Sequence, residues 1–211
     1  MKLAISLIIP TYNEEKNVNI ILHNIKLINA MENLIVDGNS IDKTKFLLKN
    51  LNIISTEPSR GLQLATGASN SSQLWFLFVH ADTKLNLYNV AEIKNFMKKK
   101  LYNKVAYFHL SFNSSSSLSK LTSIWANFRT KYFKLPYGDQ CLLISKKYYE
   151  KLGGFKTIAV MEDMDLMLRI PKNNKFFFKT HVETSFQKYN INGFFKQSLT
   201  NIIKQIRFLL K

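Results

Sequence analysis

The stretch LWFLFVHADT, residues 74–83, decides the fold of this chain. Its first part, Trp75 to Val79, is continuously bulky and apolar, as expected of a strand that is covered on both faces. Such strands belong to parallel sheets, and ligands of open parallel sheets collect just beyond the carboxyl ends of the strands. His80 and Asp82 end the run and are therefore expected at a binding site. The alternative is a polar pair at which a strand merely reaches the surface.

Short apolar runs alternate with helical patterns on both sides of this stretch. The predicted strands of the first half are residues 3–9, 33–36, 52–55 and 74–79. The helical patterns that follow them begin at Glu14, Asp42, Gly61 and Val90. Alternation of this kind is typical of right-handed βαβ units around a parallel sheet.

The second half is less regular, with a predicted strand over 105–112, a polar loop over 113–117, a helix over 118–133 and a strand over 140–144. No segment has the composition of a domain linker. We expect one Rossmann-like α/β domain over 1–191 with a mostly parallel central sheet, followed by a C-terminal amphipathic helix over 192–211. The nucleotide-binding half of the domain is expected at about 1–112 and the acceptor half at about 113–191.

The composition excludes several classes of protein. With 211 residues, 46% of them hydrophobic and 13% aromatic, the chain is long and apolar enough to form a core and is not a disordered protein. Its one cysteine, Cys141, allows no internal disulfide and fits a reducing cytoplasm. The apolar run over 3–9 is too short for a signal peptide, and no run approaches the ~20 residues that span a bilayer.

The chain is strongly basic, with a formal net charge of +16. A lysine-rich proteome, an anionic membrane surface, a phosphorylated substrate or nucleic acid would each account for this charge. Nucleic acid is the least favoured partner, because no known recognition signature is present. In the C-terminal segment apolar residues recur at three- and four-residue steps from Phe195 to Leu210, with basic residues mostly off that face. This predicts either a helix packed on its own domain or an interfacial helix on anionic lipid.

Polar residues follow the first two predicted strands. The first strand ends in PTYNEE, in which Asn13 is a candidate helix cap, whereas Thr11 and Tyr12 are placed to meet a base or ribose. The second ends in VDGNSIDKT, in which a turn at residues 38–39 precedes Ser40 and Asp42, the candidate caps of the next helix. Asp37 remains, and a carboxylate at this point is where such folds hold a ribose hydroxyl or a base N–H.

Two further groups of residues carry charge at predicted helix starts. Arg60 beside Gly61 would form an anion site. In the stretch EDMDLMLRI, residues 162–170, Leu166 and Ile170 are expected to anchor a helix in the core, which leaves Glu162 and Asp163 at the start of that helix. A carboxylate held there can act as a general base, and the alternative is an ordinary charged helix start.

The order of these motifs resembles the family 2 glycosyltransferases of GT-A fold. The closer resemblance is to a bacterial subgroup of short enzymes that carry HADT in place of a DxD motif, then PYGDQ, LGGF and MED-x-[DE]-L-x-x-R. The corresponding segments here are residues 80–83, 136–140, 152–155 and 161–169. The match runs from about Ile5 to Gly193.

The resemblance implies an inverting, metal-dependent enzyme that moves a sugar from a nucleotide-diphosphate sugar to a hydroxyl or carboxyl acceptor, possibly lipid-like. The implied donor-binding residues are Pro10, Thr11, Tyr12, Glu14, Asp37, Arg60, Gly61, His80 and Asp82. Asp82, with His80 as a lesser ligand, would hold Mg²⁺ or Mn²⁺, and Asp163 would be the general base. The implied acceptor-binding residues are Tyr137, Gly138, Asp139, Gln140 and Glu162.

This sequence departs from the family pattern at two places. The usual VDDGS is VDGNS here, so a second carboxylate is missing after Asp37, and the subgroup's TSARRW is TSFQKY over 184–189. Loss of two arginines removes a bidentate anion contact. A degenerate nucleotide-sugar-binding homologue therefore stays open as an alternative. A nucleotidyltransferase is the other, although PTYNEE lacks the glycine- and lysine-rich loop of that class.

Overall fold

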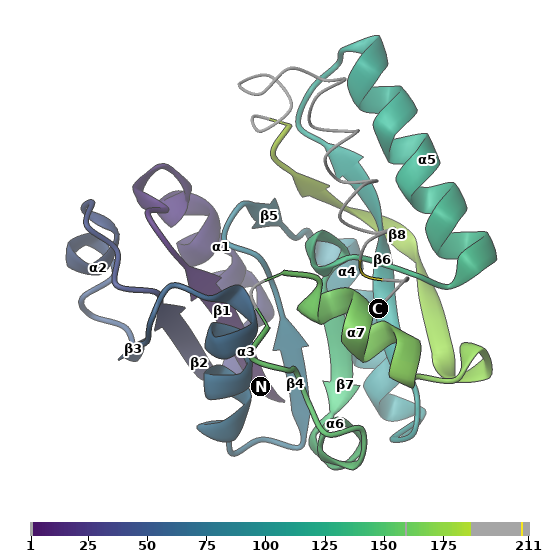
Figure 1. Cartoon of the computed structure of the whole chain (residues 1–211), viewed down its shortest axis with the longest axis horizontal. Coiled ribbons are helices and arrows are strands. Elements are labelled where there is room, and N and C mark those ends of the chain that lie inside the picture. Colours follow the sequence, from purple (N-terminus) through teal and green to yellow (C-terminus); the bar gives the residue numbers. More distant parts are fainter. Residues whose placement is uncertain (1, 159, 187–207, 209–211) are drawn as a thin grey trace.

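The computed structural model describes residues 2–158, 160–186 and 208, and these form one mixed sheet flanked by helices (Figure 1). The strands are β1 (Leu3–Thr11), β2 (Ala30–Asp37), β3 (Ile53–Ser55), β4 (Trp75–Phe78), β5 (Thr83–Lys84), β6 (Val105–Phe112), β7 (Leu142–Ser145) and β8 (Lys175–Thr184). The α-helices are α1 (Val18–Ile28), α2 (Thr44–Leu47), α3 (Arg60–Ser69), α4 (Leu87–Lys98), α5 (Ser117–Phe133), α6 (Lys146–Lys151) and α7 (Glu162–Arg169). Short 3₁₀ turns lie at Glu15–Asn17, Gly138–Gln140 and Lys172–Asn174.

The strand order in the described part of the chain is β3-β2-β1-β4-β7-β6-β8-β5. Strands β1 to β4 are mutually parallel, which confirms the βαβ prediction for the first half. β7 runs antiparallel to β4, with Phe78 opposite Leu142. The segment that enters β7 therefore lies beside the carboxyl end of β4, where His80 and Asp82 follow. The topology thus brings residues 80–82 and 138–141 to one edge of the sheet.

Strand β4 is buried on both faces, as its sequence predicted. Trp75 and Leu77 pack on the face covered by α1 and α4, whereas Phe76 and Phe78 pack on the face covered by α3, α6 and α7. All four side chains are at most 3% exposed. Full burial of such a side chain contributes roughly 1.5–3 kcal/mol, so this strand is a main source of stability for the sheet.

Helix α3 lies directly against the sheet because of a glycine. A Cβ at Gly67 would stand 2.4 Å from Cγ2 of Ile8 on β1. Only glycine permits this approach, since real side chains do not tolerate such a contact. The close packing fixes the position of Arg60, the first residue of α3, near the carboxyl end of β1.

Several predicted ends of helices and strands differ from the structure. Asn13 has a φ of +54° and does not cap α1, because its side-chain oxygen accepts a hydrogen bond from the amide of Ile41 instead. Helix α2 is a single turn that follows Lys43 and is shorter than the predicted 42–48. The Asp42 carboxylate accepts a hydrogen bond from the amide of Thr44, the first residue of α2, whereas Ser40 does not cap the helix. Gln140 belongs to a 3₁₀ turn rather than to the strand predicted over 140–144.

The described helices include none that is both long and apolar enough to cross a bilayer. The C-terminal helix predicted over 192–211 lies outside the described residues, apart from Phe208. Figure 1 shows α5 as a long helix at the outer edge of the molecule, alongside β6.

Candidate active site

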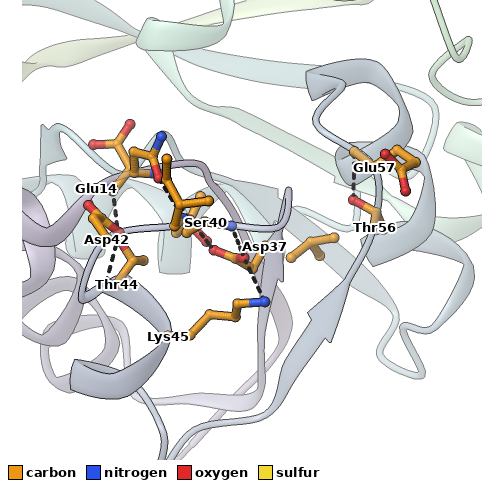
Figure 2. A network of polar contacts seen from close by, with 12 residues as sticks. Glu14, Asp37, Ser40, Asp42, Thr44, Lys45, Thr56 and Glu57 are labelled. Carbon is orange, nitrogen blue, oxygen red and sulfur yellow. Dashed lines mark hydrogen bonds and ion pairs between the residues drawn. The ribbon is translucent and has the colours of Figure 1, made fainter.

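The loops after β1 and β2 are tied together by Asp37 at the end of β2. Thr11 Oγ1 donates to one carboxylate oxygen over 2.9 Å, and the amide of Ser40 donates to the other over 2.8 Å. Figure 2 shows this carboxylate facing Ser40 and the ammonium group of Lys45, which lies 3.8 Å away. Asp37 is fully buried, so its carboxylate joins the two loops from inside. A direct contact between Asp37 and a ligand stays a prediction.

A second set of bonds joins the same two loops nearer the surface. The amide of Glu14 donates to Thr44 Oγ1 over 2.8 Å, and Asp42 accepts hydrogen bonds from the amides of Thr44 and Glu15 (Figure 2). Burial opposes ionisation of Asp42, but the hydrogen bond from the Thr44 hydroxyl, together with those from the two amides, holds the pKa of Asp42 below its usual value. The residues expected as helix caps therefore brace the loop that follows β1.

An open pocket of about 200 Å³ lies at the carboxyl ends of β1 and β4. Its walls are formed by Pro10, Thr11, Tyr12, Glu14, Pro58, Arg60, Gln63, His80, Ala81 and Asp82. Seven of these were predicted as donor-binding residues, whereas Asp37 and Gly61 do not line the pocket. The fold thus brings together PTYNEE, the start of α3 and HADT, which are far apart in sequence.

The sequence reasoning missed the part played by Gln63 and Pro58. The side-chain amide of Gln63 donates to the carbonyl oxygens of Thr11, over 2.7 Å, and Val36, over 2.8 Å. Gln63 is 4% exposed. The signal available in the sequence was a side-chain amide in the first turn of the helix that begins with Arg60-Gly61. It ties α3 to the ends of both strands and so sets the pocket floor.

Helix α7 begins at the edge of this pocket with two acidic residues. Its preceding residue, Met161, has a left-handed backbone with a φ of +65°. The guanidinium of Arg60 donates to the carboxylate of Glu162, which is fully buried, and Arg60 Nη2 lies 3.9 Å from Asp163 Oδ2. Burial raises the pKa of Glu162, with Asp163 adding and Arg60 opposing.

Gly61 makes this junction possible through its lack of a side chain. A Cβ there would lie 2.5 Å from the carbonyl oxygen of Lys156 and 3.3 Å from Cβ of Glu162. The segment before α7 therefore packs directly on the first turn of α3. Gly61 acts by allowing close packing, and a contact with the donor stays a prediction.

The Asp163 carboxylate is held in one orientation by two backbone amides. Gly138 N–H donates to Oδ2 over 2.9 Å, and Met164 N–H donates to Oδ1 over 2.8 Å. A Cβ at Gly138 would lie 2.5 Å from His80 Nε2 and 3.6 Å from Asp163 Oδ2. His80, the predicted metal ligand, and Asp163, the predicted base, therefore both lie against Gly138, and the three residues line a small cavity of about 20 Å³.

The predicted acceptor segment is held by its own side chains. Gln140 is fully buried, and its amide oxygen accepts from Thr130 Oγ1 over 2.8 Å and from the amide of Tyr137 over 3.1 Å. The guanidinium carbon of Arg129 lies 3.4 Å from the centre of the Tyr137 ring. Gln140 therefore shapes the segment, and acceptor contacts by Tyr137, Gly138 and Gln140 stay predictions.

Asp139 is the most perturbed carboxyl group of the site. Burial, together with the charges of Asp163 and Asp82, raises its pKa to about 6, against the opposing effect of Arg129 and Arg60. Within the described part of the chain, its Oδ1 is buried and has no hydrogen-bond partner. Perturbed carboxyl groups of this kind are concentrated at functional sites.

Asp82, Asp139 and Asp163 are close enough for their charges to interact, and the first of these lines the open pocket. Carboxylate oxygens are the ligands that Mg²⁺ and Mn²⁺ prefer, and the buried oxygen of Asp139 without a partner fits a cation nearby. No group of three His, Cys, Asp or Glu side chains among the described residues already has the geometry of a metal site. The residue types present fit a divalent cation.

Solved structures that share the fold are similar in shape and distant in sequence. TarS 1–349 from S. aureus in complex with UDP has a TM-score of 0.66 at 17% identity, over 88% of this chain and 60% of that one. The mannosyltransferase PcManGT from Pyrobaculum calidifontis, in complex with GDP-Man and Mn²⁺, has a TM-score of 0.65 at 16% identity, over 87% and 57%. Glucosyl-3-phosphoglycerate synthase from Mycobacterium tuberculosis, in complex with Mn²⁺, UDP and glucosyl-3-phosphoglycerate, has a TM-score of 0.60 at 15% identity, over 85% and 70%.

The chain therefore has the GT-A fold of glycosyltransferases. The sequence pattern of the family described as glycosyl transferase family 2 matches residues 6–153, and the chain belongs to that family. No protein among those of curated function matches the sequence. The chain spans 60% of the length of the TarS 1–349 structure. The predicted family is confirmed, and the narrower subgroup with HADT stays a prediction.

Proposed function

We propose that this protein transfers a sugar from a nucleoside-diphosphate sugar to an acceptor, with inversion at the anomeric carbon. The observation that carries the proposal is the pocket at the carboxyl ends of β1 and β4, which opens beside an oriented carboxylate, Asp163. Ligands of open α/β sheets bind in this position. Family membership adds the reaction class.

The donor is proposed to lie in the 200 Å³ pocket. The ring of Tyr12, which is 49% exposed, stacks on the base, and Thr11 and Glu14 receive the nucleoside. Arg60 at the start of α3 supplies positive charge to the diphosphate. Asp82, with His80 beside it, would hold Mg²⁺ or Mn²⁺, and a cation bound there supplies charge that stabilises the nucleoside-diphosphate leaving group.

Asp163 is proposed to take the proton from an acceptor hydroxyl. As the acceptor oxygen forms its bond to the anomeric carbon, the bond from that carbon to the diphosphate breaks and its electron pair leaves with the nucleoside diphosphate. Attack on the face opposite the leaving group inverts the configuration. The amides of Gly138 and Met164 keep the carboxylate aimed. A carboxylate acceptor would need no such proton transfer.

The test is turnover of nucleotide sugars. The protein is screened by thermal shift against UDP-, GDP- and dTDP-sugars with Mn²⁺, and the sugar that stabilises it most is then followed for release of nucleoside diphosphate. Release of nucleoside diphosphate is the expected result. Release of pyrophosphate would indicate a nucleotidyltransferase instead, and binding without turnover over a panel of acceptors would indicate a degenerate binding homologue.

A further inference from the structure

Helix α5 presents large apolar side chains to solvent. Six of them, which we call the α5 stripe, are between 44% and 65% exposed: Leu121, Ile124, Trp125, Phe128, Tyr132 and Phe133. The rings form a continuous surface, since Trp125 and Phe128 stack at 5.9 Å and Phe128 lies 4.5 Å from Tyr132. A single exposed apolar residue needs no explanation, whereas a contiguous stripe marks an interaction surface.

The side chains on the face of α5 that packs on the rest of the protein are small or polar. Ser119, Ala126 and Thr130 are its buried residues. The side-chain amide of Asn127 exchanges two hydrogen bonds with the backbone of Leu110 on β6, over 2.8 and 2.9 Å. A surface helix normally turns its apolar face toward the core. Here these polar contacts fix the opposite orientation, so the apolar stripe is held outward by the fold.

The segment of sequence that carries the stripe is basic. No acidic residue occurs in the sequence between Glu92 and Asp139, and α5 carries Lys120, Arg129 and Lys131. Tryptophan, tyrosine and basic side chains around an apolar surface are the composition of helices that lie in the interface of an anionic bilayer. We propose that the α5 stripe docks on anionic membrane lipid.

Charge separates lipid from the other partners that could cover the stripe. A second copy of this chain brings a net charge of +16 and the same basic helix. The segment 194–211 of this chain contains no acidic residue and four basic ones, Lys196, Lys204, Arg207 and Lys211. Neither complements the charge of α5, whereas an anionic lipid surface does.

The same helix holds the predicted acceptor segment. Thr130 bonds to Gln140, and Arg129 stacks on Tyr137, so docking of α5 would hold residues 137–140 one helix diameter, ~10 Å, from the lipid. If the proposed sugar transfer is right, on which this step rests, the acceptor is an amphiphile that resides in the membrane. Its polar group would reach Asp163 while its apolar part stays in the lipid.

Intrinsic fluorescence provides a direct readout, because the two tryptophans differ in exposure. Trp125 is 57% exposed on the stripe, whereas Trp75 is 3% exposed in the core. Addition of phosphatidylcholine vesicles that contain phosphatidylglycerol should shift the emission to the blue and carry the protein into the pellet on sedimentation. Vesicles of phosphatidylcholine alone should do so far less. A full-length protein that stays in the supernatant at low salt with unchanged emission would overturn the proposal.

Matched variants locate the docking surface. Leu121→Ser/Phe128→Ser should lower vesicle partitioning by on the order of 10²-fold, because two apolar side chains no longer enter the lipid. Leu87→Ser/Tyr88→Ser removes side chains on α4 that are 74% and 76% exposed and should leave partitioning unchanged. Ile202→Ser/Ile206→Ser removes two apolar side chains from the C-terminal segment and should likewise leave partitioning unchanged. Loss of partitioning in this last variant alone would assign docking to that segment and overturn the α5 assignment.

Two further measurements complete the test. Loss of a dimer on gel filtration in Leu121→Ser/Phe128→Ser, without vesicle binding by the parent chain, would identify a second copy as the partner and contradict the proposal. Hydrolysis of the nucleotide sugar in solution should be unchanged in this variant, since neither residue lines the pocket. If the parent chain hydrolyses the nucleotide sugar but does not bind vesicles, the docking proposal alone is wrong. If it binds vesicles but does not hydrolyse the sugar, the proposed enzyme function alone is wrong.

Discussion

Arg60 and Glu162, separated by 102 positions in the chain, form an ion pair that joins the first residue of α3 to the first residue of α7. The carboxylate side chain is 1% exposed, whereas the arginine side chain is 42% exposed. The buried charge of Glu162 therefore depends on the partly exposed Arg60 for its neutralisation. It also holds the two helix starts that carry the proposed donor and base residues.

Arg60→Ala should destabilise the protein because it leaves a buried carboxylate without its partner. Breaking a buried pair costs roughly 3–5 kcal/mol, and solvent around Arg60 reduces this to about 2 kcal/mol. Arg60→Ala/Glu162→Gln should recover most of the loss, since the buried charge is gone. Denaturant unfolding of the two single variants and the double variant checks this. Equal losses in Arg60→Ala and the double variant would show that the unpaired charge of Glu162 is not the cause of the loss.

Asp82→Ala should abolish the metal-dependent part of nucleotide binding, because it removes the carboxylate of HADT. Calorimetry of nucleoside diphosphate with and without Mn²⁺ measures this part separately. Glu57→Gln is the matched control, since it removes an exposed carboxylate from the loop next to Pro58, a pocket residue. If Asp82→Ala binds nucleotide and Mn²⁺ as the parent chain does, the cation is held elsewhere.

Asp163→Asn should keep donor binding and lower turnover. Loss of a general base typically costs ~10²–10⁴-fold in rate. The asparagine retains the size of the side chain and an oxygen that can accept from the Gly138 or Met164 amide. Steady-state kinetics with the best donor, beside a calorimetric dissociation constant, separates the two effects. Transfer at the parent rate would place the base at another residue.

Asp139 makes stability depend on pH in a direction that is unusual for an aspartate. Its pKa is raised from 3.8 to about 6 on folding, so between these values the folded protein holds a proton that the unfolded chain has lost. The stability that this group contributes is therefore fully present below pH 3.8, the pKa in the unfolded chain. It falls as the pH rises to about 6, the pKa in the folded protein, and stays low at higher pH.

Asp139→Asn should accordingly raise the melting temperature above about pH 6 and give no gain below about pH 4. Differential scanning calorimetry at the two ends of this range checks the sign. Glu57→Gln again serves as control for the loss of one negative charge from a chain of net charge +16. An equal gain in melting temperature at both ends of the pH range would show that burial of the Asp139 charge is not its cause.

The parallel half of the fold could be predicted because local pattern and tertiary position agree there. Residues 75–79 are apolar at every position, and only a strand covered on both faces can bury all of them. The family resemblance implied that PTYNEE, Arg60 and HADT bind one donor. In the structure residues of all three line the same pocket, and donor binding there stays a prediction.

The remaining features depend on contacts that no local pattern encodes. Asp37 lies at the end of a strand, where a ligand-binding residue is expected, yet its carboxylate accepts hydrogen bonds from the hydroxyl groups of Thr11 and Ser40. The apolar spacing of α5 predicted a helix, but the sequence does not state which face is inside, and the hydrogen bonds between Asn127 and Leu110 decide that. Sequence patterns specify elements better than they specify the partners of each side chain.

The missing second carboxylate after Asp37 is linked to Gln63. A Cβ at Gly38 would stand 3.3 Å from Gln63 Nε2 and 3.1 Å from Cα of Pro58, so a side chain at position 38 would press on the amide that reaches Thr11 and Val36. Positions 38 and 63 are therefore coupled through packing. A side chain at position 38 would act on the ends of both β1 and β2, because Gln63 bonds to the carbonyl oxygens of Thr11 and Val36.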